Sequence, residues 1–238
     1  MEFVRYDVNK YSPRQMVTLP LVLLLIAGMV LGYTTLTTGL PLQPGIDFAG
    51  GTAVTVFTSD SRETIEATFS AYPLLSVGEG IGNGKYIKFG PMDDAQYQSL
   101  SALINEKYPD AKVDQIGETF GKTLQGQAFF AVLLSFIGMS IVVLIAFRNL
   151  VPAGAVVLAA FSDIAITAAI MQVIGIPLSL GTTAALLMLI GYSVDSDILL
   201  TTRVLKRKGK LEDKLSGAFR TGIIMTTTTL SAVAAMWV

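Results

Sequence analysis

Five long apolar stretches alternate with polar segments along this chain. They cover residues 16–35, 128–147, 152–174, 179–202 and 218–238. Each has about 20 residues, the length that an α-helix needs to cross ~30 Å of hydrocarbon. The pattern predicts a membrane α-helical bundle, with a short N-terminal segment at 1–15, a first transmembrane helix at 16–36, and four further helices within 127–238.

Residues 37–126 differ from these stretches because they are polar and alternate in a way typical of a small folded domain. The predicted elements are a strand at 51–58, a helix at 61–70, strands at 74–80 and 85–90 around a Gly-Asn-Gly turn, a helix at 92–108 and a strand at 111–119. The order β-α-β-β-α-β predicts an α+β domain of the ferredoxin-like type.

The composition agrees with a membrane protein and narrows the chemistry. The chain is 52% hydrophobic and 15% charged, with a mean hydropathy of +0.59. It has no cysteine and no histidine, which excludes disulfides, thiolate chemistry and the commonest general base, zinc ligand and pH switch. We therefore expect no cofactor and no metal site.

The basic residues predict the orientation of the helices. They gather in the N-terminal segment 1–15, at Arg148 and in a loop at 203–217, and all three lie on one side of a five-helix arrangement. By the positive-inside rule that side is cytoplasmic, which makes 37–126 extracytoplasmic in the cell membrane. The basic loop is expected to contact membrane lipids, and it lacks the interleaved aromatic residues typical of nucleic-acid binding.

Four charged residues lie inside the predicted membrane helices: Asp163, Asp195, Asp197 and Arg220. Charges in hydrocarbon are costly, so such residues usually face a protein interior and serve a function. One hypothesis is an ion-coupling relay in which a carboxylate gains or loses a proton and changes its pairing with Arg220. The alternative is that the charges pair with one another and only hold helices together.

The neighbours of the two adjacent aspartates suggest different roles for them. Asp195 and Asp197 are about 200° apart around a helix, so they face different surroundings. Ser193, Asp197 and Thr201 follow one another at intervals of four and form a polar stripe, while Arg203 is expected to mark the aqueous end.

The segment Gly45–Thr52 (GIDFAGGT) joins the first helix to the polar domain. Gly45, Gly50 and Gly51 permit tight turns, and Asp47 is expected to cap local backbone amides. No Lys-Ser/Thr follows the glycines and no helix pattern starts there, which argues against a phosphate-binding loop. We expect a hinge or a domain-to-membrane junction.

These motifs together resemble the SecF family of protein-export membrane proteins. GIDFAGGT resembles the SecF form of a signature that SecD carries differently, and GYSVDSDILLTTRV resembles the SecF motif GYSINDTxxxFDR. The resemblance also extends to Asp163, with Ser162 at the position of a histidine, and to the pair Arg220-Thr221. It covers the whole chain.

Two departures from the family pattern affect the expected site. The functional aspartate of the bacterial motif aligns with Ser196 rather than with Asp195 or Asp197, and the Asp-Ser-Asp form resembles archaeal SecF. The family has six membrane helices, and this chain shows five, so a sixth is expected to be absent or to follow.

The resemblance implies a non-enzymatic transport subunit. It implies a partnership with SecD in an architecture similar to the RND (resistance-nodulation-division) transporters, next to a SecY-type channel and the emerging secretory polypeptide. A proton gradient would act through the four intramembrane charged residues, with Ser193, Ser196, Thr201 and Arg203 as supporting polar residues.

Three other functions compete with this one. The chain could be a structural partner of SecD with no ion coupling. An intramembrane aspartyl protease is suggested by Asp163 and Asp195 on adjacent helices, but the Gly-x-Gly-Asp element of such enzymes is missing. The third is half of a small-molecule exporter. The polar domain at 37–126 argues against it, because the outer domains of such exporters are much larger.

Overall fold

The chain forms two compact units in a computed structural model, which describes residues 12–79, 84–206 and 208–237. The helical unit contains the described residues of Met1–Pro41, Val132–Ile174 and Ala184–Val238. The sheet unit contains Leu42–Ala131 together with Gly175–Thr183. The second unit is therefore built from two segments that are far apart in the sequence.

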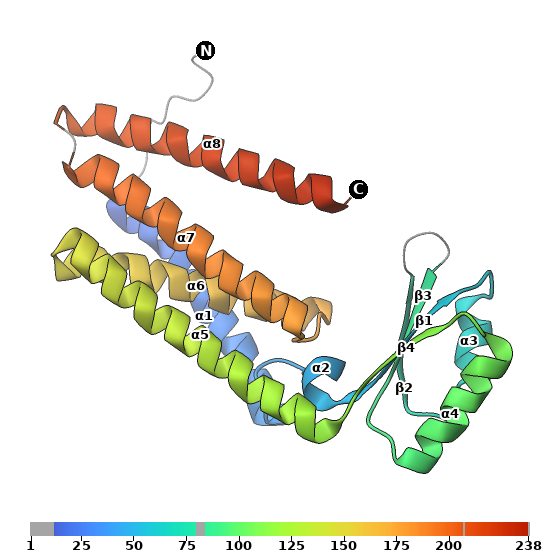
Figure 1. Ribbon diagram of the computed structural model, residues 1–238. Helices are drawn as coiled ribbons and strands as arrows, with labels where there is room; N and C mark the ends of the chain where they lie inside the picture. The colour runs from blue at the N-terminus through green and yellow to red at the C-terminus, as the bar shows by residue number, and fades with distance from the viewer. Residues whose placement is uncertain (1–11, 80–83, 207, 238) are drawn as a thin grey trace. The chain divides into compact units, whose positions relative to one another are not determined.

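Long helices make up the helical unit (Figure 1): α1 (Pro13–Thr38), α6 (Leu150–Ile174), α8 (Leu211–Trp237) and most of α5 (Glu118–Phe147) and α7 (Leu180–Lys206). Among the described residues, α1, α5, α6 and α7 are long and apolar enough to cross a membrane. Helix α8 is as long as α7, but Arg220 and its threonines make it less apolar. The fifth crossing therefore stays a prediction.

Small residues on α6 allow its neighbours to pack closely. Ala153 and Ala160 are buried with Val143 of α5 and with Ile190 and Val194 of α7 in one hydrophobic cluster. Helix α6 also packs against α1. Because lipid tails are as apolar as leucine, close van der Waals packing of this kind is what holds helices together in a bilayer.

The sheet unit is built on four antiparallel strands in the order β2-β3-β1-β4: β1 (Gly51–Phe57), β2 (Leu74–Glu79), β3 (Gly84–Phe89) and β4 (Lys112–Ile116). Alternate residues of β1 point into the core, so Val54 and Val56 are fully buried. Helices α3 (Arg62–Thr68) and α4 (Asp94–Lys107) supply Ile65 and Leu100 to the same core.

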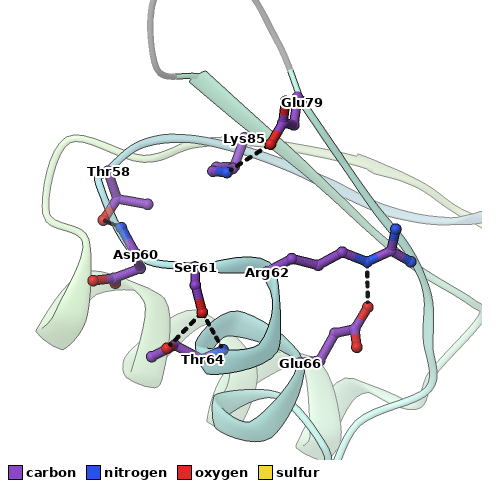
Figure 2. A network of polar contacts seen from close by, with 8 residues as sticks. All are labelled: Thr58, Asp60, Ser61, Arg62, Thr64, Glu66, Glu79 and Lys85. Carbon is purple, nitrogen blue, oxygen red and sulfur yellow. Dashed lines mark hydrogen bonds and ion pairs between the residues drawn. The ribbon is translucent and has the colours of Figure 1, made fainter.

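Polar contacts fix the ends of these two helices. The Ser61 hydroxyl accepts a hydrogen bond from the Thr64 amide at the start of α3, and Arg62 pairs with Glu66 one turn later (Figure 2). At the end of α4, the Tyr108 hydroxyl donates to Asp60 at 2.7 Å. Burial, together with this bond to a carboxylate, raises the pKa of Tyr108 to about 12.

The signature segment, defined here as residues 43–51, is fastened to the loop between α6 and α7. The Gly45 amide donates to the Leu178 carbonyl at 2.7 Å, and the Leu178 amide donates to the Gln43 carbonyl at 2.8 Å. The Asp47 carboxylate accepts the Leu180 amide at 2.9 Å. Asp47 was expected to cap local amides, but it caps the first turn of a helix 133 residues later.

Glycines allow the backbone to approach closely around the signature segment. Gly50 and Gly51 have positive φ angles of 80° and 141°, which disfavour residues with a side chain. A Cβ atom on Gly50 would lie 2.8 Å from Cα of Glu118, and one on Gly121 would lie 2.8 Å from the Phe48 carbonyl oxygen. The start of α5 is therefore packed directly on the short helix α2 (Ile46–Ala49).

The structure corrects two local predictions. The last strand ends at Ile116, and helix α5 already begins at Glu118, so the strand predicted at 111–119 is too long. The basic loop predicted at 203–217 is mostly helical, because α7 runs to Lys206 and α8 starts at Leu211. The predicted Gly-Asn-Gly turn lies largely outside the described residues.

A pair of Gly→Ala variants in α5 tests the close approach at Gly121. Gly126 lies in the same helix with no atom within 4 Å of an added Cβ. We expect Gly126→Ala to raise the free energy of unfolding by up to about 1 kcal/mol, because glycine is a poor helix former. Gly121→Ala should lower it by about 1–3 kcal/mol through steric overlap. Denaturant titration in detergent micelles, followed by circular dichroism, measures both; equal effects would contradict the described packing.

Substitution of Asp47 tests the cap on α7. Asp47→Ala leaves the Leu180 amide without its acceptor, and we expect the first turn of α7 to open more readily by about 1 kcal/mol. Hydrogen exchange of the peptide covering residues 178–185 should accelerate about fivefold. Asp47→Asn keeps an acceptor oxygen and should accelerate exchange less. Unchanged exchange in both variants would show that the carboxylate does not hold the helix.

Candidate functional site

A hydrogen bond joins α6 and α7 in the middle of the helical unit. The Ser193 hydroxyl of α7 donates to the Asp163 carboxylate of α6. Ser193 is buried, with 8% of its surface exposed. The sequence placed both residues among the candidates, and the structure brings them into direct contact. A carboxylate that accepts a hydroxyl bond is partly compensated for its removal from water.

Asp197 lies one turn beyond Ser193 on the same side of α7. It is half-buried and lies one helical turn from the hydrogen bond between Ser193 and Asp163. Within the described part of the chain, Oδ2 of Asp197 and Oγ of Ser196 are buried and have no hydrogen-bond partner. An ionised carboxylate in such a place is costly unless a proton or a cation neutralises it.

Asp195 faces a different environment, as its spacing predicted. It is exposed on the surface of the helical unit, while Asp197 and Thr201 are half-buried and Ser193 is buried. The predicted polar stripe therefore lies on the packed side of α7. The structure separates the two adjacent aspartates into one that faces the helix bundle and one that faces outward.

Arg203 connects α7 to α8. Its guanidinium donates to the Gly217 carbonyl at 3.5 Å and to the Thr221 hydroxyl. The Tyr192 hydroxyl contacts Thr226 of α8 at 3.4 Å. Arg203 was predicted to mark the aqueous end of α7. Its bonds to α8 were not predicted, because no local pattern indicates that Gly217 and Thr221 lie opposite it.

Arg220 does not meet the aspartates within the described residues. Its side chain is exposed, and the ion pairs of the described chain are Arg62–Glu66, Lys85–Glu79 and Lys122–Glu118. The expected pairing of Arg220 with a carboxylate is therefore absent from this part of the chain.

Among the residues that the structure describes, the acidic side chains do not assemble a metal-binding group of three. Asp163 and Asp197 contribute two carboxylates, and no cluster of three Asp or Glu side chains occurs in the residues that the structure describes. We define the α6–α7 cluster as Asp163, Ser193, Ser196 and Asp197; it combines two carboxylates with two hydroxyl groups.

The signature residues form a second, separate constellation in the sheet unit. Gly45, Asp47, Gly50 and Gly51 come together around α2 with the loop before α7. The sequence identified these positions but not their contacts with Leu178 and Leu180. Contacts between segments so far apart in the chain leave no local pattern by which to predict them.

Comparisons with known proteins place the whole chain in one family. The C-terminal family of protein export membrane proteins SecD/SecF matches residues 96–238. A "Protein-export membrane protein SecF" of Methanolacinia petrolearia is 58% identical over 233 residues, which is 98% of this chain and 82% of the relative. A protein of the same name from Haloferax volcanii is 40% identical over 238 residues, covering 97% of this chain and 80% of the relative.

A solved structure shows the same arrangement. The crystal structure of SecDF, a translocon-associated membrane protein from Thermus thermophilus, matches with a TM-score of 0.70 and 25% sequence identity. The match covers 96% of this chain and 33% of the SecDF chain, so this chain spans about a third of that protein. From the family match and the identity to its relatives over nearly the full length, the chain belongs to the SecF family of protein-export membrane proteins.

Proposed function

We propose that the chain works as the SecF subunit beside SecD and assists the Sec-dependent movement of polypeptides across the cytoplasmic membrane. The similarity to one third of a SecDF chain supports this, because a SecD partner would supply much of the remainder. A SecY-type channel, the emerging secretory chain and membrane lipids complete the proposed surroundings, with no role for nucleic acid.

The proposed architecture is an RND-like helical bundle with a ferredoxin-like outer domain. The strand order β2-β3-β1-β4, antiparallel throughout with α3 and α4 as the two crossover helices, supports the description of the domain. The distribution of basic residues supports a multi-pass orientation with the N-terminus in the cytoplasm and residues 37–126 outside.

Ion coupling at the α6–α7 cluster is the mechanistic part of the proposal. One observation carries it: the buried Oδ2 atom of Asp197 has no partner among the described residues, one helical turn from the hydrogen bond that joins Ser193 to Asp163. Binding of a proton or cation would neutralise this carboxylate and change how α6 and α7 pack. Asp195 and Arg220, both exposed on the helical unit, are then available to a partner subunit.

A purely structural partner of SecD is the main competing function. The bonds from Ser193 to Asp163 and from Arg203 to Thr221 favour it, because they link helices without requiring any movement. An intramembrane protease fits less well. Asp195 lies on the exposed side of α7, and Asp163 is engaged by Ser193 on the packed side.

Charge-removing variants distinguish coupling from scaffolding. In a secretion assay with SecD co-expressed, we expect Asp197→Asn and Asp163→Asn to reduce export to the level of membranes without this chain. Asparagine keeps size and polarity but cannot ionise. We also expect dependence on the proton or sodium gradient to disappear in these variants. Asp195→Asn and Arg220→Met test the outward-facing charges in the same assay.

Asp213→Asn provides the matched control, because it makes the same chemical change at an exposed position in the first turn of α8. All variants must accumulate in the membrane at normal levels. Normal, gradient-dependent export by both Asp197→Asn and Asp163→Asn would reject the coupling hypothesis and favour the structural partner.

A further inference from the structure

An apolar groove runs between α5 and α6 on the surface of the helical unit. Its volume is about 510 Å³, within the range of small-molecule sites in proteins. Its walls include Phe136, Ser140 and Leu144 from α5 and Leu150, Gly154 and Phe161 from α6. Leu150 and Phe161 are 76% and 53% exposed, so the groove opens outward rather than into the core.

The walls of the groove offer no free polar group to a ligand. Its one hydroxyl, on Ser140, already donates to the Phe136 carbonyl at 2.7 Å. The rings of Phe136 and Phe161 meet edge to face with their centroids 6.3 Å apart at one end. The groove therefore suits an apolar chain that lies along it.

The opposite end of the groove lies at the turn between α5 and α6, where two basic side chains gather. Leu144 and Leu150 flank Arg148, whose φ of 52° reverses the chain in the left-handed conformation. The Lys206 ammonium, at the end of α7, donates to the Ala146 carbonyl at 3.4 Å. Arg148 therefore lies in the turn at the groove entrance, and Lys206 reaches the last turn of α5 next to it.

Neither basic side chain is neutralised within the chain as described. Both are exposed, and the three ion pairs among the described residues involve other side chains. The groove entrance consequently carries two positive charges next to an apolar channel. This combination is complementary to a molecule with an anionic head and a hydrocarbon tail.

We propose that this groove binds an anionic phospholipid, with its phosphate at Arg148 and Lys206 and one hydrocarbon chain along the groove. The charge of the groove entrance favours a lipid over an apolar helix of another subunit, because two exposed basic side chains there are complementary to a phosphate. Leu144 and Phe136 are eight residues apart, about 12 Å along a helix axis, so the groove holds the first part of the hydrocarbon chain.

Native mass spectrometry of the full chain in detergent tests the site. The probes are dioleoylphosphatidylglycerol, which is anionic, and dioleoylphosphatidylcholine, which is zwitterionic, added in equal amounts. We expect the wild-type chain to retain the anionic lipid preferentially. Arg148→Asn and Lys206→Gln should each weaken that preference about fivefold, because each basic side chain near a membrane surface contributes comparably. Asparagine tolerates the left-handed backbone at position 148.

Two further variants separate this site from non-specific binding. Lys210→Gln makes the same charge change in the α7–α8 turn and should leave the preference unchanged. Gly154→Leu places a side chain where an added Cβ has no atom within 4 Å, so it fills the groove without disturbing the helix and should reduce retention of both lipids. An equal loss in Lys210→Gln, or full retention in Gly154→Leu, would overturn the proposal. Displacement of the lipid by co-purified SecD would instead identify the groove as a helix interface and would also overturn it.

Discussion

The close approach of three backbone segments around α2 is the constraint on which the sheet unit depends. The Gly45 amide bonds to Leu178, Asp47 accepts the Leu180 amide, and Gly121 leaves room for the Phe48 carbonyl. Side chains at the glycine positions would separate these segments by several tenths of an ångström or more. The beginnings of β1, α5 and α7 are therefore held together by close backbone approaches and by the Asp47 carboxylate.

This arrangement changes the interpretation of the signature segment. A run of glycines suggests flexibility, and a hinge was one of the expected functions. In the structure the same glycines permit a dense set of hydrogen bonds and close contacts with the loop before α7 and with the start of α5. The Asp47 carboxylate caps the first turn of the helix that carries Asp197.

Much of the fold follows from local sequence patterns. The strand spacing of Val54 and Val56, the Ser61 cap and the long apolar runs predicted strands, short helices and long apolar helices. The structure confirms these as helices and strands, and four of the long helices in the described chain are apolar enough to cross a membrane. The separation of Asp195 from Asp197 followed from helical geometry alone. Patterns of this kind depend only on residues within a few positions of each other.

The contacts of the candidate sites were harder to predict for a physical reason. Arg203 bonds to Thr221 and Asp47 bonds to Leu180 because tertiary packing brings distant segments together. Any threonine could accept a bond from an arginine, and any helix start could donate one to an aspartate. The residue types alone therefore do not identify the partners. Arg220 was expected to pair inside the chain because a lone charge in hydrocarbon is costly. In the structure its side chain is exposed and takes part in none of the ion pairs of the described residues.

The two-segment composition of the sheet unit has a consequence for biogenesis. Residues 175–183 leave the ribosome only after α5 and α6 have been made, so the contacts of Gly45 and Asp47 cannot form while the strands are being synthesised. The sheet can assemble early. The hydrogen bonds that join the signature segment to the start of α7 form later, after α5 and α6 have been synthesised. A fragment ending before residue 175 would present the signature segment with its backbone partners missing.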